Sequence, residues 1–471
     1  MYNSINIFEL QKNKPIGDDV NFDVNEINHA LQNIWDNKYA FHSLSDNFSS
    51  ESKDQKFLTI NENSIEAGKY IGVIKTKSAT INIFPKIFDT EENRTRINDR
   101  DFHQYVFSHL IWWMSFSDKI RFPKVYSSFD STTNTDLLEL LVYNFAYYTE
   151  ELINTYSYSS YELVSENLSQ VKGKINFNQY ISNIASGNWH QIPCEFDEFR
   201  FDNQLNRIIK YVCKELLLPY IQNSNTKNLL TSIIHSLDEV QDEFVTLEDC
   251  DKVMLNPLYE EYVLVLDYCK MFLSNSIVSA DSKDNTIFSF VIESSKLFEN
   301  FIEGFIKKNK ASVGVKKIHT QKGKYIGKDL ETKQSIFKTS IDFLIEKDDT
   351  EKVLVDAKYK RVWAEKGEGK KRNYGIESAD IYQMLAYSNL HKIPKVILFY
   401  PLYFDEDDNI SHAFEFDNQA NKLNKVNIEA RTLPLINHDE NKFKGSHFKL
   451  NDIFSSNNDE ICKLLSGLYQ K

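Results

Sequence analysis

Two apolar stretches joined by a short polar segment constrain the fold of this chain more than any other feature. The stretches cover residues 341–346 and 353–359, and the polar segment covers residues 347–351. A tight hairpin centred near Asp349 places Asp342 opposite Asp356. Because side chains alternate along a strand, Asp356 and Lys358 share one face. The sequence therefore predicts a hairpin that carries two opposed carboxyls and a lysine.

Such a pair of carboxyls needs a positive partner. Directly opposed acids, with Cβ atoms about 5 Å apart, destabilise a sheet unless a cation lies between them. A small number of oxygen ligands suits Mg²⁺, or Mn²⁺, and the ion can activate water for attack on a phosphodiester. The lysine can orient that water or neutralise charge on the phosphate. Asp-x-Lys also occurs on exposed hairpins, but the apolar neighbours indicate a buried strand, which tolerates charges only when they are paired.

Two helices are expected beside this hairpin. Residues 294–309 form an amphipathic helix with Glu299 on the border of its apolar stripe, where it can reach the site or remain solvated. Residues 378–390 form a second helix, on which Asp380, Gln383 and Tyr387 share a face. Gln383 then either belongs to an ordinary polar face or binds a phosphate or orients Lys358. Tyr387 is expected to brace the helix by packing.

The order of these elements resembles the PD-(D/E)xK nucleases, although Ile341 replaces the proline that usually precedes the first acid. Several further segments resemble the McrC family, the nuclease subunit of McrBC-type modification-dependent restriction systems. They are GVIK at 72–75, INIFPKI at 81–87, VKGKI at 171–175, CEFDEF at 194–199, DNQLNR at 202–207, KLFE at 296–299, DAKYK at 356–360 and DIYQMLAY at 380–387. These segments keep the order of the family along the chain.

The resemblance implies an α/β multidomain protein in three parts. Residues 1–164 are a β-rich domain with helices that docks on a partner, residues 165–289 are mainly helical, and residues 290–471 are the PD-(D/E)xK domain. It also implies roles for single residues: Asp342 and Asp356 bind metal, Glu299 is a third carboxylate, Lys358 is catalytic and Gln383 supports it. Either one or two metal ions fit these ligands.

The charge of the chain bears on its partners. Its 471 residues carry a formal net charge of -13, which opposes contact with DNA phosphates unless basic residues are concentrated locally or a partner provides the contact. Residues 307–328 contain eight lysines and no acid, and residues 366–372 form a second basic cluster. Such runs are usually solvated loops, but their position beside the predicted site equally favours phosphate contact.

Several sequence patterns are missing. The chain has no Gly-x-x-x-x-Gly-Lys-Ser/Thr loop, so we expect it to bind no nucleotide. The resemblance implies that a separate McrB-like AAA+ hexamer, usually driven by GTP, binds modified double-stranded DNA and recruits this chain. Five widely spaced cysteines and the lack of a long apolar run predict a cytoplasmic protein with no membrane contact.

Two alternative functions remain at this point. The chain can be a non-catalytic activator or scaffold of the AAA+ partner, in which case the intact acids and lysine would be unexplained. It can also be a nuclease of the same fold that works alone, on RNA or on unmodified DNA. The acidic charge of the chain argues against the second alternative.

Overall fold

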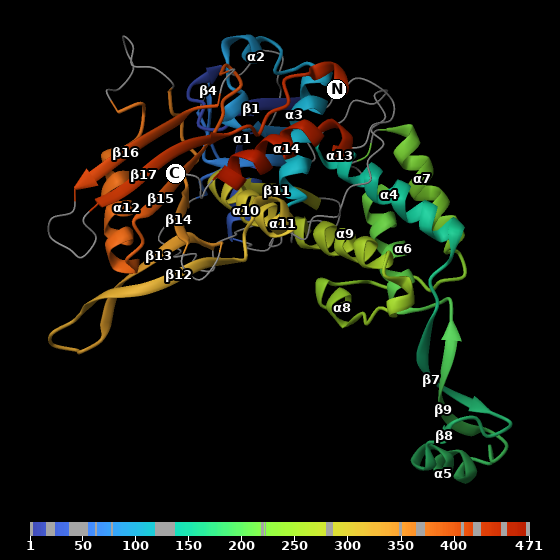
Figure 1. Cartoon of the computed structure of the whole chain (residues 1–471). Coiled ribbons are helices and arrows are strands. Elements are labelled where there is room, and N and C mark those ends of the chain that lie inside the picture. The colour runs from blue at the N-terminus through green and yellow to red at the C-terminus, as the bar shows by residue number, and fades with distance from the viewer. Residues whose placement is uncertain are drawn as a thin grey trace. The chain divides into compact units, whose positions relative to one another are not determined.

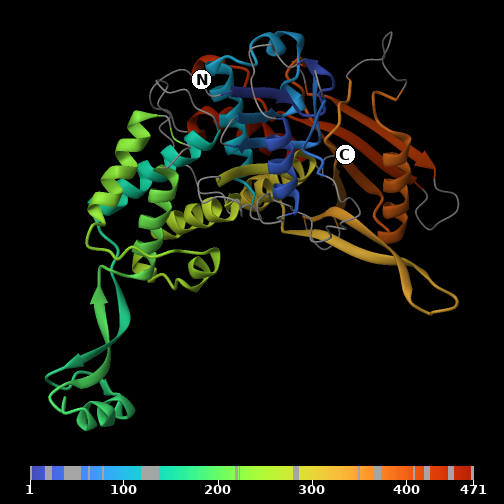
Figure 2. The same cartoon turned by 180° about the vertical axis from the view of Figure 1, so that it is seen from behind.

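The chain forms two compact units. The computed structural model describes residues 3–15, 24–36, 55–61, 64–76, 79–117, 137–217, 221, 223–278, 286–347, 351–363, 373–406, 409–417, 425–443 and 450–467. Unit 1 combines residues 1–138 with residues 275–471, and unit 2 consists of residues 139–274 (Figures 1 and 2). These units do not correspond one to one with the three parts expected from the sequence, which stay a prediction.

A five-stranded sheet in unit 1 draws its strands from both ends of the chain. Strands β5 and β11 pair antiparallel, with Val291 opposite Gly72. Strands β5 and β6 are buried along their whole length, including the polar side chains of Lys75, Thr80 and Asn82. The sheet has the order β1-β6-β5-β11-β10, with β1 Asn3–Phe8, β5 Tyr70–Lys75, β6 Ala79–Phe84, β10 Ser276–Val278 and β11 Thr286–Glu293.

Smaller elements pack around this sheet. A three-stranded sheet, β2-β4-β3, shares one apolar core with helix α1, in which the rings of Trp35, Phe57 and Tyr70 meet edge to face. Helix α3 belongs to the same unit, whereas α4 lies almost wholly in unit 2. The bounds are β2 Lys14–Pro15, β3 Leu58–Ile60, β4 Ser64–Ala67, α1 Val24–Asp36, η2 Lys86–Phe88, α2 Glu91–Thr95, α3 Arg100–Met114 and α4 Leu137–Thr155.

A six-stranded mixed sheet contains the predicted hairpin. Its order is β12-β13-β14-β15-β17-β16, with β12 Lys317–Lys328, β13 Ser335–Glu346, β14 Lys352–Ala357, β15 Lys395–Pro401, β16 Ser411–Asp417 and β17 Lys425–Leu433. Strands β13 and β14 are antiparallel, and helix α12 (Ser378–His391) connects β14 to its parallel neighbour β15. Phe343 lies opposite Val355, so one further step brings Asp342 opposite Asp356, as the hairpin pattern predicts.

Helix α10 (Ser294–Lys308) follows β11 directly and buries its apolar face, as its sequence predicts. Gly304 permits a close approach at this helix, because a Cβ there would lie 1.6 Å from the backbone oxygen of Phe116. The remaining helical elements of unit 1 are α11 Lys310–Val313, η4 Glu440–Phe443, α13 Leu450–Ile453 and α14 Ser455–Ser466.

Unit 2 combines helices with a three-stranded sheet of order β7-β9-β8. The long strands β7 and β9 form a ribbon, and α5 and β8 lie at its far end (Figure 1). Helix α6 buries the stripe of apolar residues that its sequence predicts. The bounds are β7 Ser160–Leu168, β8 Lys174–Ile175, α5 Phe177–Ala185, β9 Ile192–Arg200, α6 Gln204–Leu217, α7 Ser224–Ser236, α8 Leu247–Lys252, η3 Pro257–Tyr259 and α9 Tyr262–Asn275. Among the helices described in either unit, none has the length and apolar character needed to cross a lipid bilayer.

Candidate functional site

Two carboxyls lie side by side where β13 and β14 meet. Asp342 is partly exposed, and its Oδ2 accepts a 3.0 Å hydrogen bond from the backbone N–H of Ala357. Asp356 is only 3 % exposed. Its Oδ2 is buried and accepts no well-directed hydrogen bond from the described residues, although a lysine nitrogen lies nearby. Neither carboxyl is therefore fully neutralised by its surroundings.

The electrostatics of the two acids reflect this arrangement. Burial, together with the charges of Asp356 and Glu299, raises the pKa of Asp342 to about 7. Burial also raises the pKa of Asp356, and Asp380 and Glu299 raise it further against the opposing effect of Lys358. The site therefore holds more negative charge than its own lysine balances, and a cation would relieve that excess.

Lys358 follows the end of β14 and is held in place from several sides. Its backbone N–H donates to the oxygen of Phe399 at 2.8 Å. Its Nζ lies 2.7 Å from Oδ2 of Asp356 and 3.7 Å from Oδ1 of Asp380. Burial alone would lower the pKa of Lys358, but these carboxylates raise it, so the lysine is a stable cation.

Gln383 on α12 forms a hydrogen bond with this lysine. Nζ of Lys358 donates to Oε1 of Gln383 at 3.0 Å, and Nε2 of Gln383 donates to the hydroxyl of Tyr387 at 3.0 Å. The two helical residues are four positions apart and so share a face. The orienting alternative for Gln383 thus has direct geometric support, and Tyr387 braces the glutamine by a hydrogen bond as well as by packing.

Glu299 on α10 is close enough to influence both acids but is paired elsewhere. It is 7 % exposed, and its Oε2 accepts from Nζ of Lys296 at 2.7 Å. Among the described residues, no three His, Cys, Asp or Glu side chains converge closely enough to hold a metal ion. Asp342 and Asp356 still fit Mg²⁺, which is commonly bound through one or two carboxylates and retains several waters. Direct ligation by Glu299 stays a prediction.

Residues that follow β1 and β6 contact the elements of the site. Nζ of Lys86 donates to the backbone oxygen of Tyr359, the residue after Lys358, at 2.9 Å. Glu9, whose carboxyl lies 3.8 Å from Nζ of Lys86, accepts a 2.6 Å hydrogen bond from the hydroxyl of Ser294 at the start of α10. Residues from the beginning of the chain thus contact both the strand end that carries Lys358 and the helix that carries Glu299.

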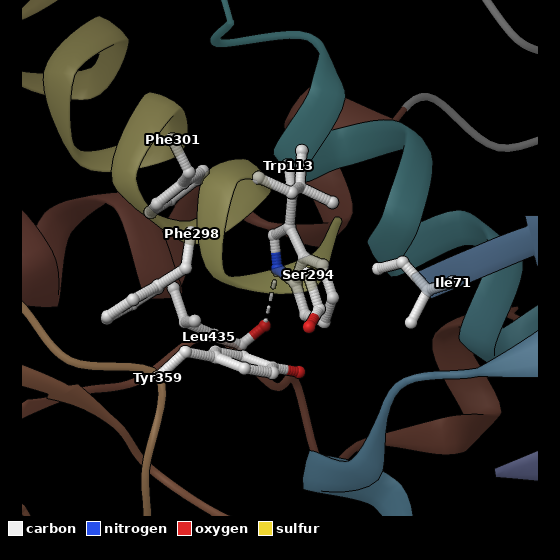
Figure 3. Close-up of a pocket in the computed structure, with 8 residues that line it drawn as sticks. Ile71, Trp113, Ser294, Phe298, Phe301, Tyr359 and Leu435 are labelled. Atoms are coloured by element: carbon white, nitrogen blue, oxygen red, sulfur yellow. Dashed lines mark hydrogen bonds between the residues drawn. The ribbon is translucent and has the colours of Figure 1, made fainter. Parts of the chain in front are cut away.

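A small apolar cavity lies beside these contacts (Figure 3). The hydroxyl of Tyr359 is buried and has no hydrogen-bond partner among the described residues. Burial raises the pKa of this phenol well above its usual value. The cavity is lined by Ile71, Trp113, Ser294, Leu297, Phe298, Phe301, Tyr359 and Leu435.

The sequence did not single out several members of this network. Lys296 precedes Glu299 by three helical positions, a spacing that predicts pairing. Lys360 lies in the DAKYK segment, and its Nζ lies 3.1 Å from Asp380 and 2.9 Å from Glu377. The contact of Lys86 with Tyr359 joins residues 273 positions apart, so no local pattern reveals it.

The structure describes only one of the two basic segments predicted to contact phosphate. Residues 307–328 cover the end of α10, α11 and all of β12, and the second cluster, at 366–372, lies outside the described residues. Strand β12 is antiparallel to β13, the strand that carries Asp342. Part of the first basic segment is therefore next to the site in the sheet.

The fold and the site define a mixed α/β protein in which a sheet presents two opposed carboxyls and an oriented lysine. A sequence profile described as "McrBC 5-methylcytosine restriction system component" matches residues 65–401. This chain belongs to that family and is a subunit of the McrC type.

One solved structure agrees in fold, and a second gives a weaker match. A chain of the Thermococcus gammatolerans assembly of McrB AAA+ hexamers with bound McrC matches at 19 % identity and a TM-score of 0.66, over 98 % of this chain and 100 % of that one. A chain of the cryo-EM structure of the Thermococcus gammatolerans McrBC complex matches at 18 % identity and a TM-score of 0.49, over 65 % of this chain and 88 % of that one. Among curated proteins, none matches the chain significantly.

Proposed function

We propose that this chain is the endonuclease subunit of an McrBC-like restriction system and that it hydrolyses phosphodiester bonds of modified double-stranded DNA. The observation that carries the proposal is the pair of opposed acids, Asp342 and Asp356, with Nζ of Lys358 held 2.7 Å from Asp356 and 3.0 Å from Gln383. A buried sheet surface would not hold this excess of negative charge without a use for it.

The order of the elements supports a PD-(D/E)xK domain. Helix α10 carries Glu299, β13 carries Asp342, β14 carries Asp356 and ends just before Lys358, and α12 carries Gln383 before the parallel strand β15. This is the succession that the resemblance implies. The acids lie at the carboxyl end of β14, where parallel strands usually present their ligands.

Each side chain has a distinct role in the proposed reaction. Asp342 and Asp356 would hold Mg²⁺, which supplies a positive charge for activating water and stabilising the phosphate. Lys358 would orient the attacking water and neutralise the charge that develops on the phosphate oxygens, while Gln383 keeps its Nζ in place. The attacking water loses a proton to solvent as its oxygen bonds to phosphorus. The bond to the leaving sugar oxygen breaks, and that oxygen takes up a proton from solvent.

A cleavage assay tests the proposal. The purified chain, an AAA+ partner encoded beside it, Mg²⁺ and either GTP or ATP are mixed with methylated or unmethylated plasmid. We expect cleavage of the methylated plasmid only in the complete mixture, and its loss in Lys358→Ala. The matched control is Lys352→Ala, a lysine of the same strand that pairs with Glu346 at 2.7 Å instead of with the site acids.

Three outcomes would refute parts of the proposal. Equal cleavage by wild type and Lys358→Ala would remove the site assignment. Stimulation of nucleotide hydrolysis by both proteins, without cleavage by either, would favour the activator function. Cleavage of unmodified DNA or RNA by the chain alone would favour a nuclease that needs no partner.

The partner would be an AAA+ hexamer of the McrB type. The resemblance implies docking through residues 1–164, but the exposed apolar surface that fits such a partner lies in unit 2, between residues 161 and 199. Helix α5 is amphipathic, yet none of its residues is buried, so its apolar face is exposed to solvent. Further exposed apolar side chains lie on the β7–β9 ribbon, where the rings of Tyr161 and Phe199 are 5.2 Å apart. Exposed apolar sets of this extent mark interaction surfaces. The docking surface consists of Tyr161, Leu163, Val171, Phe177, Ile181, Ile184, Trp189 and Phe199.

The glycine in the VKGKI segment helps to build this surface. Gly173 has a φ of +69°, and a Cβ there would lie 2.4 Å from the backbone oxygen of Glu195 and 2.7 Å from Cβ of Phe196. Only glycine permits β8 to pack this closely on β9. This part of the chain is therefore shaped by a local constraint, while its apolar side chains remain free for a partner.

A substitution tests the docking surface separately from the chemistry. Ile181→Asp places a charge on the exposed apolar face of α5 and is expected to weaken binding to the AAA+ hexamer at least tenfold, because it would bury an unpaired carboxylate. The control is Leu258→Asp, since Leu258 is also exposed in unit 2 but lies outside the docking surface. Equal binding by both variants would contradict the assignment of this surface.

A further inference from the structure

The β12–β13 hairpin extends beyond the rest of its sheet. Strand β13 pairs with β14 only from Phe343 to Glu346, whereas it pairs with β12 as far as Ser335, opposite Lys328. We call residues 321–341 the arm (Figures 1 and 2). Eight residues of strand at ~3.3 Å each make it about 25 Å long. The arm begins next to Asp342.

The strands of the arm are basic. Lysines occupy positions 322, 324 and 328 of β12 and position 338 of β13, and a fifth lysine follows at 333 in the turn. Lys328 and Lys333 are exposed, and neither forms an ion pair with a described residue. Tyr325 is 55 % exposed and adds a hydroxyl on the same ribbon.

The arm contains five lysines and two acids, Asp329 and Glu331, and Glu331 is exposed. Asp329 accepts hydrogen bonds from the backbone N–H groups of Glu331 and Thr332 at 2.8 and 2.7 Å, which lowers its pKa and fixes the turn. At the base of the hairpin, Glu346 pairs with Lys352 at 2.7 Å. The arm therefore has three more lysines than acids, in a chain whose net charge is -13, and the described side chains of Lys328 and Lys333 are exposed.

We propose that the arm binds phosphates of the DNA duplex beside the bond that is cut. This inference rests on the proposed nuclease function and specifies how the site receives its substrate. The arm continues the strand of Asp342, so a duplex that reaches the acids also passes along the arm. A two-stranded ribbon fits the major groove of DNA, which is about 12 Å wide, and lysine and tyrosine side chains contact phosphate oxygens.

Protection of a free sheet edge is the ordinary role of such lysines. Strand β12 is the first strand of its sheet, and lysines on edge strands hinder pairing with other chains. Edge protection does not require the lysines to lie on the hairpin that carries Asp342. It also does not require the turn that fixes Asp329 at the tip of the arm. The observations therefore favour DNA as the partner that the arm binds.

The test is salt-dependent DNA binding by the full chain in complex with its AAA+ partner. A short fluorescent duplex containing 5-methylcytosine is titrated in EDTA, which prevents cleavage. We expect Lys324→Ala/Lys328→Ala to bind about tenfold more weakly, and to lower the slope of log K against log salt by about 2, because each lost phosphate contact removes about 0.9. The control is Lys352→Ala/Lys425→Ala, which removes two lysines paired with Glu346 and Glu415 in the same sheet.

The outcomes separate the arm from the nuclease. If both double variants bind DNA equally, with equal slopes, in complexes that still cleave DNA, the proposed role of the arm is overturned. The proposed nuclease function is left intact by that result. Absence of any duplex binding by the wild-type complex would overturn both. A photocrosslinker at position 325 gives a second readout: crosslinks to DNA support the arm, and crosslinks confined to the AAA+ protein refute it.

Discussion

The raised pKa of Asp342 makes a prediction about stability. The carboxyl titrates near 7 in the folded chain and near 3.8 without its neighbours. Because folding raises this pKa, the protonated carboxyl contributes stability that is fully present below the unfolded value and is lost as the pH rises from there through about 7. Between pH 4 and pH 8, wild type should therefore lose stability that Asp342→Asn retains.

The magnitude follows from the shift. A rise of about three pH units corresponds to ~4 kcal/mol at about 1.36 kcal/mol per unit. Because Asp342 is partly exposed, solvent screening reduces this value, and we expect the asparagine variant to be ~2 kcal/mol more stable at pH 8. At pH 4 the two proteins should unfold with nearly equal free energies, since the carboxyl is then protonated.

Urea unfolding in EDTA at several pH values measures this difference. Asp329→Asn is a control of opposite sign, because hydrogen bonds from backbone N–H groups lower the pKa of Asp329. Adding Mg²⁺ at pH 8 should stabilise wild type and leave Asp342→Asn unchanged, since a ligand stabilises only the protein that binds it. A difference between wild type and Asp342→Asn that does not change with pH would refute the electrostatic argument.

Three further predictions concern neighbouring side chains. Glu299→Gln should weaken Mg²⁺ binding, measured by calorimetry, severalfold. Glu303→Gln is the control, because Glu303 is also 7 % exposed and is paired on the same helix, and it should not change the affinity. Equal affinities of the two variants would exclude Glu299 from the metal site. Gln383→Ala should slow cleavage ~10 to 100-fold and Tyr387→Phe less than ~10-fold, both with unchanged KM for DNA. The reason is that only the first variant removes the contact to Lys358. A larger effect of Tyr387→Phe would contradict the proposed role of Gln383. Tyr359→Phe should leave thermal stability unchanged or raise it by ~1 kcal/mol, because the buried hydroxyl has no partner among the described residues. A clear loss of stability would contradict this argument.

The sequence predicted the hairpin and its flanking helices because their signals are local. Alternation along β13 and β14 sets which residues share a face, and a short turn sets the register that brings Asp342 opposite Asp356. The helical spacing of Gln383 and Tyr387 likewise predicts their common face. These elements were accessible to prediction without knowledge of the rest of the chain.

The support of the site depends on contacts that local patterns do not encode. The pairing of β5 with β11 joins residues near 72 to residues near 291. The hydrogen bond from Lys86 to the oxygen of Tyr359 depends on that sheet being formed. In the sequence, the INIFPKI segment carries information only through its resemblance to the family. The contact of its lysine, Lys86, follows from the way the strands are connected.

The distribution of charge suggests why a chain of this kind should need a partner. Lys358 and Lys296 are each paired with an acid of the site, so their positive charges are engaged there and little is left for DNA. A net charge of -13 adds a long-range repulsion that salt screens only partly. In the proposed mechanism the arm attracts DNA phosphates locally, and the AAA+ hexamer brings the duplex to the site. Cleavage by the isolated chain should then be weak even with Mg²⁺ present, and should rise steeply when the partner is added.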